Sequence, residues 1–412
     1  MRIRKADLPD IAIWGLIGFY TLVAHWIWFY RGIQETVIIV LAAAVIVSRA
    51  SFKIKTTQAV MFFAVLALAV ETTLTTLKAV STNYFMQDIK PMLGCFLVFC
   101  YLFQFRQMKY DKFEQFSEMM LKILNWYTAF NHVIIIIQSR VPYFLMNRSA
   151  VESVNNSLYF DQLTGFLGVN GTTRWSMITT LVIVFNFLEV IKRKNQSKSK
   201  KRLIYYNIGL VAVSMYIAAL NSARAFFILM PLTLILFFVY AVSLNWNRKL
   251  KTFIAVSVVL VIFFMFYMYN SSVRNYVNDL IEDKFNVYWS WNIDTMIAAN
   301  DDRAIAVDFA LRNGGLFGVG IGYVPMHSSN DEVTYLGLNS VSSYVYMIGT
   351  VGYLLYVFTL SLIVISRKDN NWSKIIVFPA YIIVVSYLLP VFSSVVLIFS
   401  LGCILATLDR KS

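Results

Sequence analysis

The chain has 412 residues, of which 58% are hydrophobic, 16% are aromatic and only 14% are charged. This composition is too apolar for the surface of a soluble protein and is typical of a polytopic membrane protein. The net charge of +14 does not indicate nucleic-acid binding, because the basic residues lie in short runs between hydrophobic segments and not along one face.

The N-terminal residues 1–5 are basic and precede the apolar segment 11–30, with no small-residue cleavage site after it. We expect this segment to stay attached as a signal anchor and to form the first span. Cys95, Cys100 and Cys403 all lie in apolar segments. Neither a disulfide framework nor a structural metal site is expected from them.

Hydrophobic segments long enough to cross a bilayer as helices recur along the chain. Twelve are predicted, give or take one, near residues 11–30, 33–48, 57–77, 91–105, 119–138, 175–191, 203–220, 226–244, 253–269, 342–366, 375–389 and 392–407. Pro390 between the last two marks either a tight hairpin between short spans or a kink in one long helix. The expected fold class is an all-α polytopic membrane protein, a single membrane domain over residues 1–412.

Basic residues predict the orientation of these spans. With the N-terminus inside, the inner segments carry 24 Lys and Arg residues, whereas the short outer segments carry 7. Because positive residues are concentrated in cytoplasmic loops, we expect both termini in the cytoplasm. Two large segments, 139–174 and 270–341, then face outward.

The second outward segment, 270–341, is predicted to contain short helices. An amphipathic helix near residues 273–283 is expected to lie at the outer interface. A further short helix follows Asp301 and Asp302, contains Arg303 and stops at the glycines 314–315. A loop of this length is rarely a passive connector, so we expect it to cover an active site.

Two arginines on the outer side are candidates for an anion site. Arg224 lies in a tight turn, residues 221–226, between two spans. A charge within the hydrocarbon costs about 2.5–3.5 kcal/mol on insertion scales, so Arg224 either faces a polar site or extends to the lipid headgroups. Arg303 either serves a site or forms a surface ion pair with Asp301 or Asp302.

Gly318, Gly320 and Gly322 form a run that lacks the lysine of a Walker motif and a preceding strand pattern. We interpret the run either as a place of close backbone approach or as a nest of amide groups for an anion.

Candidate bases are few, because the chain has three histidines. His327 alone lies in a loop that can reach over a site, with Asp331 and Glu332 as rivals. His25, His132 and Glu71 lie in the outer parts of predicted helices, where hydrogen bonds between helices explain each of them at least as well as catalysis does.

Several of these features occur in an order that is found in one family. Arg303 precedes Gly314 by eleven residues, and the run 316–322 is followed by Asn339 and Ser340 and by the glycines 349 and 352. Residues 221–226 are similar to an "SRga" turn, and residues 161–170 to an "RxxGxxgnpN" segment. Together they resemble the arginine, the "GvGxG" turn and the "HNsxLxxLxexGxxG" helix of the bacterial O-antigen ligase and polymerase superfamily (WaaL and Wzy). The resemblance covers residues 160–360.

Two positions depart from the family pattern. Leu338 stands where a ligase has its histidine, and the arginine of the "RxxG" segment is replaced near Gln162, which leaves Arg140, Arg148 or Arg174 as substitutes. The resemblance therefore favours a Wzy-type polymerase, with transfer of glycan to lipid A-core or protein by a ligase as the alternative. A lipid-oligosaccharide flippase is less favoured, because the halves of the chain show no internal repeat.

The resemblance implies a GT-C-like glycosyltransferase on the outer face of the bacterial inner membrane. Its donor and acceptor would be undecaprenyl-diphosphate-linked oligosaccharides, joined into O-antigen or capsular polysaccharide by inverting transfer, with no metal and no cofactor. A chain-length regulator is the protein partner that it suggests. The candidate catalytic residues are Arg303 and Arg224, which match arginines of the family pattern, and His327, which is chosen for its position in the long outer loop. The candidate substrate-binding residues are Arg174, Asn339, Gly318, Gly320 and Tyr323.

Overall fold

The computed structural model describes residues 7–19, 31–49, 56–77, 85–141, 144–145, 163–167, 171–192, 197–221, 223–241, 302–322, 335–362 and 372–408, with single positions between 257 and 278. In this part of the chain 89% of the structure is helical and no strand occurs. The all-α prediction is therefore confirmed for the described residues.

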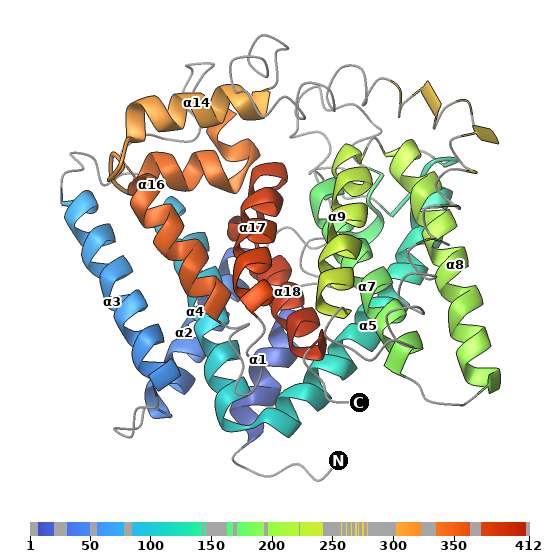
Figure 1. Cartoon of the computed structure of the whole chain (residues 1–412), viewed down its shortest axis with the longest axis horizontal. Helices are drawn as coiled ribbons and strands as arrows, with labels where there is room; N and C mark the ends of the chain where they lie inside the picture. Colours follow the sequence, from blue (N-terminus) through green and yellow to red (C-terminus); the bar gives the residue numbers. More distant parts are fainter. Residues whose placement is uncertain are drawn as a thin grey trace. The chain divides into compact units, whose positions relative to one another are not determined.

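The helices follow one another as shown in Figure 1. They are α1 (Leu8–Phe19), α2 (Arg31–Ser48), α3 (Thr56–Thr76), α4 (Phe85–Met108), α5 (Tyr110–Gln138), η5 (Gly165–Leu167), α7 (Thr172–Lys192), α8 (Ser197–Leu220), α9 (Arg224–Ala241), α14 (Asp302–Gly314), η7 (Tyr335–Leu338), α16 (Ser340–Ser361), α17 (Trp372–Leu388), η9 (Val391–Ser393) and α18 (Val395–Leu408). Helix α17 ends at Leu388 and α18 begins at Val395, with Pro390 and η9 between them, so a single long helix kinked at Pro390 is excluded.

Four of the described helices are long and apolar enough to cross a membrane, over Asp88–Met108, Asp111–Gln138, Lys201–Leu220 and Ser340–Ser361. Shorter apolar helices include α1 and parts of α2, α3, α9 and α17. On α3 the exposed side chains of Phe62, Phe63 and Leu66 lie on one side, and Ala64 and Leu68 are buried on the other. An exposed apolar stripe of this kind is typical of a helix that faces lipid.

Several helices extend beyond the predicted apolar windows. For example, α5 begins at Tyr110, whereas the window begins at residue 119. In its first turns Phe113, Phe116 and Met120 are buried at helical spacing, and charged residues lie between them. A hydropathy window finds the apolar part of a helix and misses such an amphipathic extension. Residues 20–30 of the predicted helix at 11–30, and most of the predicted helices at 253–269 and 273–283, lie outside the described residues.

The chain divides into two compact units, each formed by separate stretches of sequence. The first comprises Met1–Gln34, Phe105–Leu280 and Phe399–Ser412, and the second comprises Glu35–Gln104 and Ile281–Ile398.

In the first unit, α7 is the central helix and packs against α5, α8 and α9. Every residue from Trp175 to Phe187 is buried, so α7 is surrounded on all sides. On α1, Trp14 is 1% exposed and lies among the rings of Phe105, Phe113, Phe116 and Phe399, with centroid distances of 6.3, 6.1, 5.4 and 4.5 Å. Such aromatic clusters contribute strongly to core packing.

In the second unit, α16 is the central helix and packs against α3, α14 and α17. It is broken at Gly349, whose φ of 73° and ψ of 173° are not helical. Figure 1 shows the first part of α16 running beside α14 and the second part turning away. The helix predicted over residues 342–366 is thus present as α16, with a break at Gly349. The reason for the break lies in the glycine run described below.

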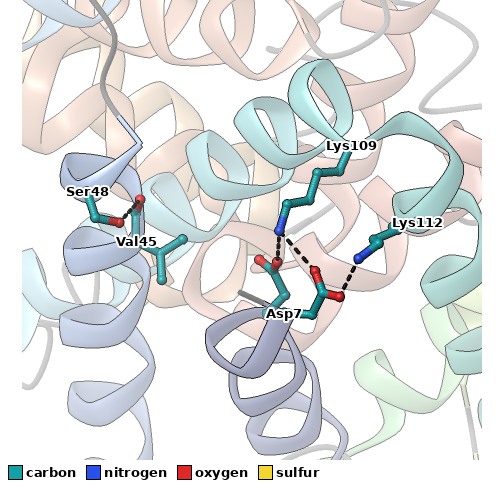
Figure 2. Close-up of polar contacts among 6 residues, drawn as sticks. Asp7, Val45, Ser48, Lys109 and Lys112 are labelled. Carbon is teal, nitrogen blue, oxygen red and sulfur yellow. Dashed lines mark hydrogen bonds and ion pairs between the residues drawn. The ribbon is translucent and has the colours of Figure 1, made fainter. Parts of the chain in front are cut away.

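A charged cluster joins the start of α1 to the junction between α4 and α5 (Figure 2). Lys109 Nζ donates to Asp7 Oδ1 at 3.2 Å and to Asp10 Oδ2 at 3.1 Å, and Lys112 Nζ donates to the other oxygen of Asp7. The Asp7 and Asp10 side chains are 4% and 1% exposed. Breaking a buried pair leaves an uncompensated charge, so the cluster holds α1 in place.

We expect this cluster to make stability depend on pH in acid. Hydrogen bonds from Lys112 and then Lys109 lower the pKa of Asp7 from 3.8 to about 2, against the opposing effect of burial. The unfolded chain therefore binds more protons between about pH 2 and pH 4, and the contribution to stability, complete above that window, is lost as the pH falls through it. Melting temperatures in detergent from pH 2 to 6 measure this loss.

Asp7→Asn should lower the melting temperature at neutral pH and flatten the slope between pH 2 and 4. Asp111→Asn, at an exposed position on α5, is the matched control and should leave the slope unchanged. An unchanged slope in Asp7→Asn would contradict the assignment.

Candidate functional site

The glycine run docks on the break in α16 through main-chain hydrogen bonds. Val319 and Gly320 donate from their N–H groups to the carbonyls of Tyr346 and Met347, each at 3.0 Å, and Gly318 N–H donates to Gly314 O at 2.8 Å. In the opposite direction, Thr350 and Val351 donate to the carbonyls of Gly315 and Leu316, each at 3.1 Å. The run thus supplies hydrogen-bond partners for the backbone N–H and C=O groups that the break in α16 leaves without helical partners.

Glycine is required where the two segments touch. Gly318 and Gly349 have φ values of 74° and 73°, which favour glycine. A Cβ on Gly318 would overlap the backbone of residues 347–349, and a Cβ on Gly349 would overlap the backbone of residues 316–318. Of the two interpretations of the run, close backbone approach describes the structure. An anion could use the N–H groups of Gly318 and Gly320 only by breaking these hydrogen bonds.

Arg303 and Asn339 lie together although they are far apart in the sequence. Asn339 Nδ2 donates to Arg303 O at 3.5 Å, and Asn339 Oδ1 accepts from Ser342 N–H at 2.7 Å as the N-cap of α16. Arg303 is the second residue of α14 and is half-buried, with Nε shielded from solvent. The starts of α14 and α16 are therefore side by side, with a guanidinium group in the first turn of α14.

The helix starts differ in what they offer to an anion. At α16, Ser340 N–H already donates to Leu389 O at 3.3 Å and Ser342 N–H to Asn339, so these donors are occupied. The start of α14 has acidic Asp302 and cationic Arg303 in its first turn. Both helix dipoles direct positive potential toward this place, each contributing about 0.3–1 kcal/mol for a bound negative charge.

The first unit brings together the two other motifs. Asn221 Nδ2 donates to Leu163 O at 3.2 Å, which links the turn before Arg224 to the segment around Gly165. Asn131 of α5 holds the same segment by donating to Thr164 O at 3.0 Å and accepting from Phe166 N–H at 2.8 Å. Asn131, Asn221, Leu163 and Thr164 are buried, so the segment is fixed against α5 and the turn between α8 and α9.

Asn131 and Gln138, which hold the turn at residues 164–166, were not among the residues predicted from the sequence. Gln138 Oε1 accepts from Gly165 N–H at 3.0 Å. The two side chains are seven residues apart in α5 and therefore share a face. The signal that could have identified them is the repetition of polar residues on one face of an apolar helix.

Two predicted arginines of the first unit, Arg174 and Arg224, lie at helix starts. Arg174 is in the first turn of α7, and its Nη1 donates to Leu167 O at 3.4 Å. Arg224 is the first residue of α9, and only its backbone is described. Because Arg224 and Arg303 belong to different units, their predicted convergence stays a prediction.

Some predicted residues lie outside the described part of the chain. These are His327, Tyr323, Asp331, Glu332, Arg148, Gln162 and His25. The assignments of a base and of an aromatic sugar contact in the 270–341 segment therefore stay predictions.

No protein-family model, curated protein or solved structure matches the chain. The resemblance described above thus rests on its short motifs, their order and their positions.

Proposed function

We propose that the chain is a membrane glycosyltransferase that polymerises undecaprenyl-diphosphate-linked oligosaccharide repeat units. In this proposal it has about twelve spans in a GT-C-like arrangement, with both termini in the cytoplasm and the reaction on the outer face of the bacterial inner membrane. The growing glycan is the donor, and a hydroxyl of a newly delivered repeat unit is the acceptor.

The observation that carries the proposal is the contact between Arg303 and Asn339. These residues match two separate motifs of the superfamily, lie 36 residues apart and meet at the start of α14. The second pair of motifs, around Leu163 and Asn221, meets in the first unit in the same manner. Random short motif matches give no reason to expect contacts between the matched segments, so these contacts support the resemblance.

The chemistry needs groups that stabilise a leaving diphosphate. A diphosphate departs without a proton, but negative charge accumulates on its oxygens. Arginine is permanently charged and can bind two oxygens at once. Arg303, assisted by the start of α14, and Arg224 are assigned this role. His327, Asp331 or Glu332 would orient or deprotonate the acceptor hydroxyl, which is worth about 10²–10⁴-fold.

The proposal is tested by supplying one substrate only. Purified chain in proteoliposomes, incubated with lipid-linked repeat unit extracted from cells that lack the chain, should yield a ladder of products that differ by one repeat unit. A ligase would give no ladder without lipid A-core or protein acceptor, and a flippase would move the lipid without changing its length. Either of those results would refute the polymerase assignment.

A further inference from the structure

In the first unit, buried polar atoms gather where α5, α7 and α9 pack together. Within the described residues, four of them have no hydrogen-bond partner: His132 Nε2, Trp175 Nε1, Thr179 Oγ1 and Thr180 Oγ1. Their residues are 2%, 1%, 1% and 0% exposed. Buried polar groups are almost always hydrogen-bonded, so these four atoms call for an explanation.

The indole of Trp175 contacts both the imidazole of His132 and the ring of Phe226. The His132 and Trp175 rings have centroids 5.8 Å apart, and the Trp175 and Phe226 rings have centroids 5.2 Å apart. Trp175 lies in the first turn of α7 and Phe226 in the first turn of α9. The indole therefore belongs to the turn that carries Arg174 and packs against the turn that carries Arg224.

We propose that His132 and Trp175 form the binding pair for the attacking hydroxyl of the acceptor sugar. This inference rests on the proposed function and adds to it a second candidate for the base, in the first unit. The Trp175 N–H can only donate, whereas one nitrogen of a neutral imidazole accepts. Together they match a hydroxyl group, which accepts through its oxygen and donates through its hydrogen. A phosphate oxygen would need two donors.

In the transfer step, one bond forms at the anomeric carbon of the donor, one bond breaks there, and one proton moves. The acceptor oxygen forms a bond to the anomeric carbon of the donor while its proton passes to Nε2 of His132. The bond from that carbon to the diphosphate oxygen breaks, and its electron pair leaves on the diphosphate. Trp175 Nε1–H holds the attacking oxygen in position.

A purely structural role predicts different consequences for the same substitution. In Trp175→Phe the ring that packs against His132 and Phe226 is kept, and only the unpartnered donor is removed. If that donor had a structural partner, its loss would lower stability. If it is kept for a substrate, its loss should leave stability unchanged or higher and should reduce the reaction rate.

The experiment compares Trp175→Phe and His132→Phe with the native chain in the single-substrate polymerisation assay, and records melting temperatures in detergent. Trp175→Phe should lower the initial rate about tenfold with no fall in melting temperature. His132→Phe should lower it by about 10²–10⁴-fold. Trp126→Phe is the matched control, because Trp126 is 78% exposed on α5, and it should change neither quantity.

Each outcome has a definite meaning. A ladder from the native chain with an unreduced rate in Trp175→Phe overturns the binding pair and leaves the polymerase assignment standing. A fall in the melting temperature of Trp175→Phe assigns its N–H a structural role and also overturns the pair. Absence of a ladder from the native chain refutes the proposed function, and the binding pair with it.

Discussion

Arg303→Ala is expected to lower the initial rate of polymerisation by about 10²–10³-fold, the loss typical for removing one group that stabilises developing negative charge. The reason is that the half-buried guanidinium at the start of α14 is assigned to the leaving diphosphate. Its replacement should leave the melting temperature close to that of the native chain. The measurement is the single-substrate assay in proteoliposomes, with ladder length and initial rate as readouts.

Two further variants separate charge from geometry. Arg303→Lys keeps the charge but loses the planar fork that binds two oxygens, so its rate should lie between those of the native chain and Arg303→Ala. Arg312→Ala is the matched control in the same helix: the Arg312 side chain is 70% exposed and pairs with Asp308 at 2.9 Å. It should keep the native rate. A native rate in Arg303→Ala would remove this residue from the mechanism.

Replacement of Gly349 or Gly318 by alanine is expected to prevent the chain from folding to a stable, monodisperse protein. Alanine at a positive φ costs about 1–2 kcal/mol. At these two positions the added methyl group would also overlap the backbone of the opposing segment, which cannot move without breaking the hydrogen bonds between them. Because proteins are only marginally stable, the two costs together suffice to disrupt the second unit.

Two glycines supply controls for the separate causes. Gly315 has a φ of 60° but nothing within 4 Å of an added Cβ, so Gly315→Ala should show the conformational cost alone. Gly209, within α8, also has open space and no positive φ, so Gly209→Ala should stabilise by up to about 1 kcal/mol. Melting temperature and size-exclusion profile in detergent give the ranking. Equal effects at 315 and 318 would show that the overlap is unimportant.

Local signals in the sequence predicted the limits of α14. The short helix with an acidic start and a glycine stop is α14, which begins at Asp302 and ends at Gly314. Its limits depend on nearest neighbours in the chain, and such signals are present in a single sequence. The separation of α17 from α18 at Pro390 likewise follows from proline chemistry.

Contacts between distant segments could be anticipated only where motifs suggested them. The break at Gly349 depends on hydrogen bonds with residues about 30 positions earlier, and an uninterrupted apolar run gives no sign of it. The same holds for Asn131, whose role depends on a segment 33 residues away. Hydropathy records which residues are apolar and does not record which backbone groups need partners from elsewhere.

The main-chain pairing of residues 315–320 with α16 also affects how this surface can change during evolution. Leu316 and Phe317 are 63% and 53% exposed, at the tip of a turn that is held by backbone atoms and glycines and not by their own side chains. Natural variation at these two positions can therefore change the exposed surface of the turn without disturbing the backbone hydrogen bonds that hold it. For the same reason, they are suitable attachment points for a fluorophore or a spin label.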